Sequence, residues 1–402
     1  MCHRCDNTIM VDGGFIVQEK LWTRDFLRLS FVSLFMYLVF YSFMVIVAIY
    51  ALQQLNASNA SAGLAAGDFL LAALVARLIA GHSIERFGKR RMILWGLLFY
   101  ALLQGFYFLA GNIYLFAIIR FIHGLAFGVC ATAVSTLAAF LVPKTRRGEG
   151  MGYFLLSTTL ASAIGPFIGL FVYRQSGFET LLLVSLGMSV LAFLLAAGIR
   201  VPREETEPAA SAAGSGLQSY FEFKALPIAL ISFLIYFCYS SLLSFFSAYA
   251  AELDMLEAGQ YFFLVYSLAI IISRPQVGKI ADHRGIHSVM YPSFLLFALG
   301  LGLLSIMRTI PVMIIAAICC GVGFGTFAAM GQVLAIQKVS RERFDIALST
   351  LLSISEFGTG VGPFLLGGLL GICGFHWLYL LAAGTTLLCG GAYYIGRKHA
   401  YI

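Results

Sequence analysis

Apolar residues run through this chain in long segments that are separated by short polar or charged breaks. Most segments are about 20 residues or longer and lack the alternation that marks membrane-spanning strands. Such a length allows a helix to cross the hydrocarbon core of a bilayer. We therefore predict an all-α polytopic membrane protein with twelve membrane-spanning helices, at residues 26–51, 63–84, 91–110, 113–142, 150–173, 179–200, 225–250, 259–281, 287–307, 310–337, 345–370 and 374–396.

The longest stretch without an apolar segment divides these helices into two sets of six. Residues 201–224 are rich in Pro, Glu, Ala, Ser and Gly, a composition that is typical of a flexible linker. The first apolar segment is too long for a cleavable signal, so we expect a permanent helix. The expected parts are a cytoplasmic N-terminus (1–25), a six-helix bundle (26–200), a cytoplasmic linker (201–224), a second six-helix bundle (225–396) and a cytoplasmic tail (397–402). Met10 is an alternative start to Met1.

Composition and charge support a membrane class and indicate the orientation. Of the residues, 60% are hydrophobic and 11% are charged, whereas a soluble domain carries about 25% charged residues. Of the 26 Lys and Arg residues, only Arg174 and Arg308 fall on one side of the predicted membrane, and Arg77, Arg120 and Arg274 fall within segments. Basic loops stay cytoplasmic, so we expect both termini inside the cytoplasmic membrane. The net charge of +7 is thereby explained by topology and does not indicate nucleic-acid binding.

The two sets of six helices share a sequence repeat. When the chain is shifted against itself by 197 residues, identical or similar residues coincide in one register over about ninety positions. The coincident pairs include Arg77 with Arg274, Gly81 with Gly278, Glu85 with Asp282, Gly88 with Gly285, Gly124 with Gly321, Gly128 with Gly325, and Gly165-Pro166 with Gly362-Pro363. Because six is an even number, both copies enter the membrane in the same direction. We predict two parallel repeats that rock about a midplane site.

A loop motif follows the second predicted helix and recurs after the eighth. Gly88 is expected to supply the positive φ of a tight turn, and Glu85 to face the N-terminus of another helix. A simple topogenic loop is the alternative, which the second copy disfavours. The candidate gate residues are Gly81, Glu85, Arg86, Gly88, Lys89 and Arg90 in the first copy, and Gly278, Asp282 and Gly285 in the second.

A second motif lies in the fifth predicted helix. Gly165, Pro166 and Gly169 combine a helix-breaking proline with residues that let a neighbouring helix pack closely. Gly362 and Pro363 repeat part of it in the eleventh helix. Ordinary small-residue packing is the alternative reading.

Charged residues within predicted spans are expensive to insert, by about 2.5–3.5 kcal/mol each, and are therefore functional candidates. Arg120, Glu356, Asp68 and His123 are our candidates for proton coupling. Each of three candidates also has a reading without proton coupling. Arg120 could extend its side chain to the membrane surface (snorkelling), and Asp68 could lie on a wetted rim. His123 could form a hydrogen bond to a neighbouring helix instead of titrating. Four tyrosines are candidates to line a central cavity with them: Tyr37, Tyr41, Tyr236 and Tyr239.

With these motifs, the chain resembles the major facilitator superfamily over all twelve predicted spans. The resemblance implies that Glu85 braces the eleventh helix when the protein is open to the outside. By this resemblance, Arg120, His123 and Gly124 correspond to a proton-coupling element of drug:proton antiporters. It also likens Gly165, Pro166 and Gly169 to an element of exporting branches, although Leu170 replaces the final glycine of that element.

We therefore expect a secondary transporter that works by alternating access, most simply a proton-coupled exporter of a small amphipathic drug or metabolite. The alternative is a facilitator or symporter that imports a nutrient such as a sugar or organic anion. An enzyme is disfavoured because the chain lacks a zinc-protease pair, a nucleophile elbow and a phosphate-binding loop. We expect a monomer that uses the proton gradient, with no cofactor and no metal, since Cys2 and Cys5 lack a second ligand pair.

Overall fold

The computed structural model describes residues 21–143, 146–200, 222–337, 339–340 and 343–399, without the side chains of residues 78–79, 81–87, 147–149, 152, 163 and 345. Cys2, Cys5, Met10 and most of the predicted linker lie outside these ranges. All the described elements are helical: α1 (Arg24–Gln54), α2 (Asn59–Phe87), α3 (Lys89–Phe106), η1 (Tyr107–Leu109), α4 (Ile113–Leu141), α5 (Arg147–Ala197), η4 (Phe223–Ala225), α6 (Leu226–Glu252), α7 (Leu256–Arg284), α8 (His287–Ser305), α9 (Ile310–Gln337) and α10 (Phe344–Lys398).

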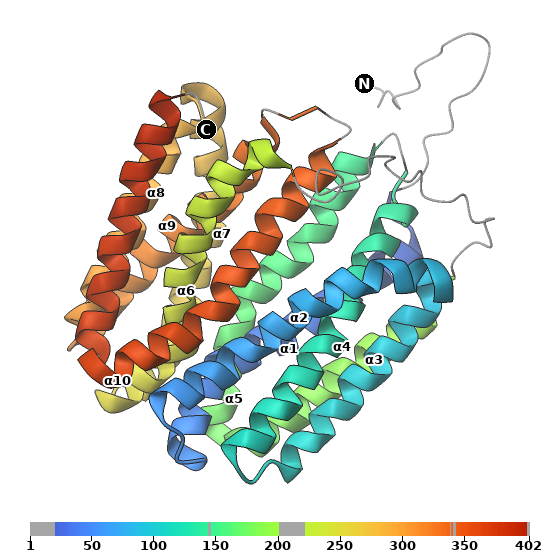
Figure 1. The fold of residues 1–402 in the computed structure, drawn as a ribbon, viewed down its shortest axis with the longest axis horizontal. Helices are drawn as coiled ribbons and strands as arrows, with labels where there is room; N and C mark the ends of the chain where they lie inside the picture. The colour runs from blue at the N-terminus through green and yellow to red at the C-terminus, as the bar shows by residue number, and fades with distance from the viewer. Residues whose placement is uncertain (1–20, 144–145, 201–221, 338, 341–342, 400–402) are drawn as a thin grey trace, which may run out of the picture.

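In the described part of the chain, ten helices are long and apolar enough to cross a membrane. Two of them, α5 and α10, have 51 and 55 residues and contain a glycine with non-helical backbone. Gly177 has φ 82° and ψ −179°, and Gly374 has φ 72° and ψ 175°. Figure 1 shows α10 as two rods that meet near its label. Each rod exceeds the roughly 20 residues that a crossing needs.

The backbone repeats with the same period as the sequence. In the described residues, the glycines with positive φ are Gly88, Gly177, Gly285 and Gly374, which form two pairs 197 residues apart. The positive φ expected of Gly88 is confirmed at 84°, and Gly285 has the same value. Two further residues with positive φ, Asn56 and Asp254, are 198 residues apart. The repeat therefore extends to the loops after α1 and α6, which the sequence comparison did not reach.

Close backbone packing joins α2 to α4 and, at equivalent positions, α7 to α9. A Cβ atom on Gly124 would overlap the carbonyl oxygen of Phe69, and one on Gly321 would overlap that of Tyr266. One turn later, a Cβ on Gly128 would overlap the carbonyl oxygen of Ala73 in α2, whereas one on Gly325 would lie against the side chain of Ile270 in α7. Lipid offers no hydrophobic drive for helix pairing, so such backbone approach by small residues supplies van der Waals contact instead.

The helices form two groups that lie side by side, α1–α5 and α6–α10 (Figure 1). The second group begins earlier than the predicted boundary at residue 225, because Glu222 is already buried. Arg343 donates a hydrogen bond of 2.5 Å to its carboxylate, and the backbone N–H of Lys224 donates one of 3.2 Å. Partial burial raises the pKa of Glu222, but the hydrogen bond from Arg343 and the one from Lys224 outweigh it, leaving the pKa below its usual value. These contacts anchor η4 to α10.

The glycine contacts predict a selective cost for a single methyl group. Gly124→Ala is expected to lower the melting temperature of the purified protein in detergent by several degrees, because overpacking costs about 1–3 kcal/mol. Gly187→Ala is the matched control, since a Cβ at that helical position meets nothing within 4 Å. It is expected to leave the melting temperature unchanged or raise it. Equal melting temperatures for both variants would contradict the packing role of Gly124.

Candidate functional site

The central feature of the structure is an ion pair that joins the two helix groups. Arg77 of α2 and Glu356 of α10 bond through Nη1 and Oε2, and their side chains are 22% and 25% exposed. The hydroxyl of Tyr37 in α1 lies within hydrogen-bonding reach of Arg77. An arginine and a glutamate within predicted spans thus neutralise each other at the boundary between the groups.

Tyrosines from both groups surround this ion pair. Tyr37 and Tyr41 lie next to one another on α1, with ring centroids 6.4 Å apart, and both lie near Glu356. Tyr236 of α6 also lies near that carboxylate and is half-buried. Tyr239, in contrast, is 5% exposed and stacks on the Phe324 ring at 3.7 Å. Three of the four predicted cavity tyrosines therefore remain partly accessible, and the fourth is packed inside the second group.

Arg120 lies elsewhere, inside the first group. It is 1% exposed, and its Nε donates to the carbonyl of Ala65 at 3.2 Å, while its guanidinium lies 4.7 Å from the centre of the Phe69 ring. Asp68 is 7% exposed and electrostatically coupled to Arg120, and its Oδ1 has no hydrogen-bond partner. Burial of this degree disagrees with snorkelling for Arg120 and with a wetted rim for Asp68.

His123 belongs to this second polar cluster. Its Nδ1 lies 3.2 Å from the hydroxyl of Tyr107, and its Nε2 is buried without a partner. The hydrogen bond that we considered for His123 is thus present, and it goes to η1. The predicted proton-coupling residues divide between two places: Glu356 at the boundary between the groups, and Arg120, Asp68 and His123 within the first group.

Sequence reasoning missed that Arg77 is the partner of Glu356. The signal was available, because Arg77 is one of three basic residues within predicted spans and an intramembrane charge needs a counter-charge. The repeat masked it, since Arg77 coincides with Arg274 and therefore looked like part of the shared framework.

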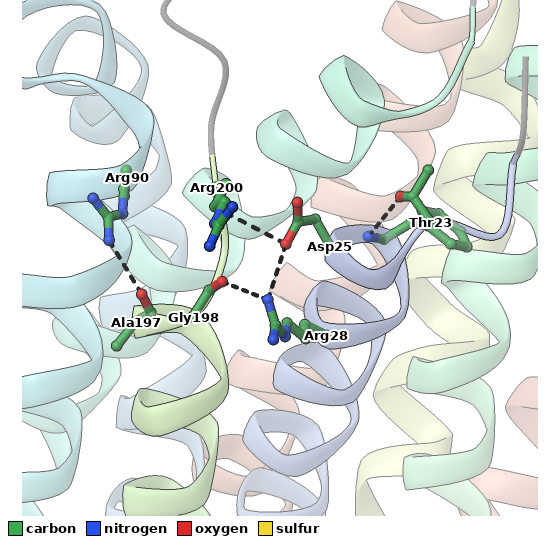
Figure 2. Close-up of polar contacts among 8 residues, drawn as sticks. Thr23, Asp25, Arg28, Arg90, Ala197, Gly198 and Arg200 are labelled. Carbon is green, nitrogen blue, oxygen red and sulfur yellow. Dashed lines mark hydrogen bonds and ion pairs between the residues drawn. The ribbon is translucent and has the colours of Figure 1, made fainter.

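The first gate motif is described only in part. The side chains of Gly81, Glu85 and Arg86 lie outside the described residues, so the expected bracing by Glu85 is untested. The ammonium of Lys89 lies 4.1 Å from the centre of the Phe140 ring. Arg90 donates to the carbonyl of Ala197 at 3.1 Å (Figure 2).

A second arginine, Arg28, also binds a backbone carbonyl at the end of α5, beside the contact of Arg90 (Figure 2). Arg28 donates to the carbonyl of Gly198 at 2.5 Å and pairs with Asp25 at 3.3 Å. Thr23 caps α1 by accepting from the backbone N–H of Phe26 at 3.1 Å. Cations stabilise the carbonyls at a helix C-terminus, so these arginines hold the end of α5 against α1 and α3.

In the second copy of the motif, Gly285 makes the turn after α7 and Asp282 is exposed. A Cβ on Gly278 would meet nothing within 4 Å. No neighbouring helix therefore approaches this glycine closely in this conformation.

The glycine-proline motif packs α5 against α1. A Cβ on Gly165 would lie 2.7 Å from the Cβ of Tyr41, and one on Gly169 would overlap the carbonyl oxygen of Ser42. The Ser42 hydroxyl also donates to the Gly165 carbonyl at 2.9 Å. Pro166 lies inside α5 between the two glycines.

The second copy of this motif makes contacts on two sides. Gly362 packs against Ser240 of α6, which repeats the contact of Gly165 with α1. Pro363 lies against Gly63 of α2, where a Cβ would overlap the proline carbonyl oxygen, and a Cβ on Gly67 would overlap that of Gly360. The eleventh predicted helix thus binds both its own group and the other one.

Apart from the Arg77–Glu356 pair, the contacts described here between the two groups gather at one end of the molecule. Ser247 donates to the carbonyl of Val45 at 2.5 Å, joining α6 to α1, and Arg174 pairs with Glu257 at 3.0 Å, joining α5 to α7. Together with the glycine contacts between α2 and α10, these lie near the end of α1 and the start of α2. That end is opposite the start of α1 and the end of α10, so the structure is closed there.

Comparison with known proteins gives a consistent result. The family model described as Major Facilitator Superfamily matches residues 29–291 and 228–401. The chain is 21% identical to the staphylopine export protein of Staphylococcus aureus over 83% of this chain and 87% of that protein. It is 22% identical to the multidrug resistance protein MdtG of Citrobacter koseri over 83% and 84%. The solved structure of the nucleoside transporter NupG has a TM-score of 0.71 at 16% identity, covering 94% of this chain and 100% of that one.

The central ion pair predicts energetic coupling between Arg77 and Glu356. In a double-mutant cycle of Arg77→Gln and Glu356→Gln, each single variant is expected to destabilise the protein, and the double variant less than their sum. Contacting charges typically couple by about 0.5–3 kcal/mol. Thermal unfolding in detergent measures the cycle.

The pair between Arg174 and Glu257 is the control, because it also joins the groups but Glu257 is 79% exposed. Exposed pairs contribute about 0–1 kcal/mol. A coupling for Arg77 and Glu356 no larger than in this control would refute a structural role for the central pair.

Proposed function

Because this chain belongs to the Major Facilitator Superfamily and is therefore a membrane transporter, we propose that it exports a small amphipathic compound in exchange for protons. The observation that carries the proposal is the ion pair between Arg77 and Glu356 at the boundary of the two helix groups. A carboxylate in this place can couple its protonation to the relative position of the groups, since only its charged form holds the arginine.

We infer twelve crossings in two parallel repeats, with α5 and α10 each crossing twice. The glycine breaks in these two helices, and the shared period of the positive-φ glycines, support this topology. With both termini in the cytoplasm, the closed end faces outward and the conformation is the one that loads substrate from inside. The cytoplasmic membrane is then the expected location.

The transport cycle follows from the charge of Glu356. With Glu356 ionised and paired to Arg77, the protein is ready to bind substrate from the cytoplasm. Substrate binding carries the protein to its outward-open state, in which Glu356 is exposed to the outer solution. The substrate leaves to the outer solution, and a proton taken up there neutralises Glu356 and frees it from Arg77. The protonated protein returns and releases the proton inside, which restores the pair.

Asp68 and Arg120 supply a second proton site in this scheme. Asp68 is buried with one oxygen unpartnered, and it lies in the same helix as Arg77. A carboxyl in that position can hold a proton while Glu356 is ionised. His123 follows Arg120 by about one turn of α4, and its partner Tyr107 has its hydroxyl within hydrogen-bonding reach of Arg120, so His123 is connected to Arg120 through Tyr107.

The direction is supported by two further features. Gly165, Pro166 and Gly169 pack α5 on α1 as in the motif of exporting branches, and the two relatives described above are an exporter and a drug-resistance protein. Import of a nutrient remains the competing function. It predicts that the substrate moves inward together with a proton.

Inverted membrane vesicles with an acidic interior test coupling and direction together. Compounds identified by a sensitivity screen of a deletion strain are added outside, and an acridine dye reports the pH gradient. For an exporter, each transported compound accumulates and dissipates the gradient. Glu356→Gln is expected to reduce this proton-coupled accumulation at least tenfold, because the carboxyl that carries the proton is gone.

Glu179→Gln is the control, since Glu179 is exposed near the break in α5 and has no place in the proposed cycle. It is expected to transport like the unmodified protein. If Glu356→Gln and Arg120→Ala both accumulate the compounds with the pH dependence of the unmodified protein, the proton-coupling assignment is wrong. Accumulation that requires the opposite gradient would establish import.

A further inference from the structure

Arg274 is an arginine within a predicted membrane span, and no described residue supplies a counter-charge to it. It lies in α7, and its side chain is exposed. In the part of the chain that the structure describes, it makes no hydrogen bond or ion pair. An intramembrane guanidinium is expensive to insert and normally finds a partner. A counter-charge from outside the chain is therefore expected to satisfy it.

The position of Arg274 follows from the packing of the helix on which it lies. Tyr266 and Ile270 of α7 meet Gly321 and Gly325 of α9, two turns and one turn before Arg274. In the first group, the corresponding contacts of α2 with α4 likewise lie two turns and one turn before Arg77, which pairs with Glu356. Since both helices pack in the same register, Arg274 occupies in the second group the place that Arg77 has in the first. That place borders the space between the groups.

The residue opposite Arg274 differs from the one opposite Arg77. In the register of 197 residues, Glu356 of α10 corresponds to Thr159 of α5. No acidic residue occurs between Gly150 and Phe178, and the one acidic residue in the first rod of α5, Glu149, lies in its first turn, ten residues before Thr159. The repeat thus contains one complete ion pair and one cation whose partner is missing.

Hydroxyl side chains occupy the position in α5 that corresponds to Glu356 and two positions near it in sequence. Thr158 and Thr159 donate to the carbonyl of Leu155 at 2.9 and 3.2 Å, and Ser162 donates to that of Thr159 at 2.8 Å. All three side chains are partly accessible. A hydroxyl bonded to its own helix can rotate to donate to a ligand instead. Hydroxyl donors that act together with a guanidinium favour a carboxylate or another oxyanion.

We propose that the exported substrate carries an anionic group, and that Arg274 binds this group with help from the hydroxyls of Thr158, Thr159 and Ser162. The proposal rests on the transport function proposed above and adds the charge of its substrate. The substrate anion completes in the second group the pair that Glu356 completes in the first. Binding brings α5 and α7 together at the cytoplasmic side, which is the movement that closes the loaded state.

Three probes with one aromatic body and different charges test this proposal on the purified protein in detergent. They are 2-naphthoate, 2-naphthamide and 2-naphthylmethylamine, titrated against the melting temperature. Naphthoate is expected to stabilise the protein with at least tenfold higher apparent affinity than the amide or the amine. Arg274→Gln is expected to weaken naphthoate binding about tenfold or more, because a charge-assisted hydrogen bond is lost. Arg274→Lys is expected to retain part of it.

Thr159→Glu provides an independent variant, since it installs the missing carboxylate. It is expected to pair with Arg274, keep or raise the melting temperature without ligand, and abolish naphthoate binding. Arg308→Gln is the control, because Arg308 is an exposed cation in the loop after α8. It is expected to bind naphthoate normally.

The proposal is overturned if the amide or amine binds as well as naphthoate, if Arg274→Gln binds naphthoate unchanged, or if none of the probes binds. These outcomes are separate from those of the vesicle assay. Proton-driven export of neutral or cationic compounds would uphold the transport function and refute the anionic substrate. Naphthoate binding through Arg274 without proton-driven export would uphold the anionic ligand and refute the proposed transport function.

Discussion

The ion pair between Arg77 and Glu356 is the contact on which the proposed function depends. It lies between two helix groups whose other contacts gather at one end, and it is half-buried. Attraction between charges is strong there because neither lipid nor bulk water screens it well. The same setting makes an uncompensated charge costly. The pair is therefore a constraint with two states: intact with Glu356 ionised, or broken with Glu356 neutral.

Backbone packing explains why this single pair can act over the whole molecule. Within each group, glycines at the crossing of α2 with α4 and of α7 with α9 bring backbones to the closest approach that helices allow. Tightly packed crossings resist gradual deformation, so the proposed cycle moves each group as a body. Between the groups, Gly63 and Gly67 pack on α10 in the half of the molecule away from the termini. In the proposed cycle, motion about that end would open or close the other end.

The helices were largely predictable because each one depends on the residue types within its own segment. The lengths of the apolar segments predicted the helices. The period of 197 residues paired Gly88 with Gly285, and both have the positive φ that glycine adopts more readily than other residue types. The pairing of side chains was less predictable. Glu356 and Arg77 are 279 positions apart, and no local rule selects one intramembrane arginine among three. Tyr239 was misplaced for a similar reason, since its stacking on Phe324 depends on how α6 meets α9.

The period also conceals function, because identical residues can have different partners. Arg77 and Arg274 coincide in the repeat, yet one meets a glutamate and the other faces a threonine position. Two equivalent halves without this difference would be neutralised equally, and neither would distinguish a proton from a substrate. With the difference, the proposed exchange can assign one arginine to the protonation of the chain itself and the other to an external anion. In that proposal, a duplicated framework becomes an exchanger because its two charge sites are no longer copies of one another.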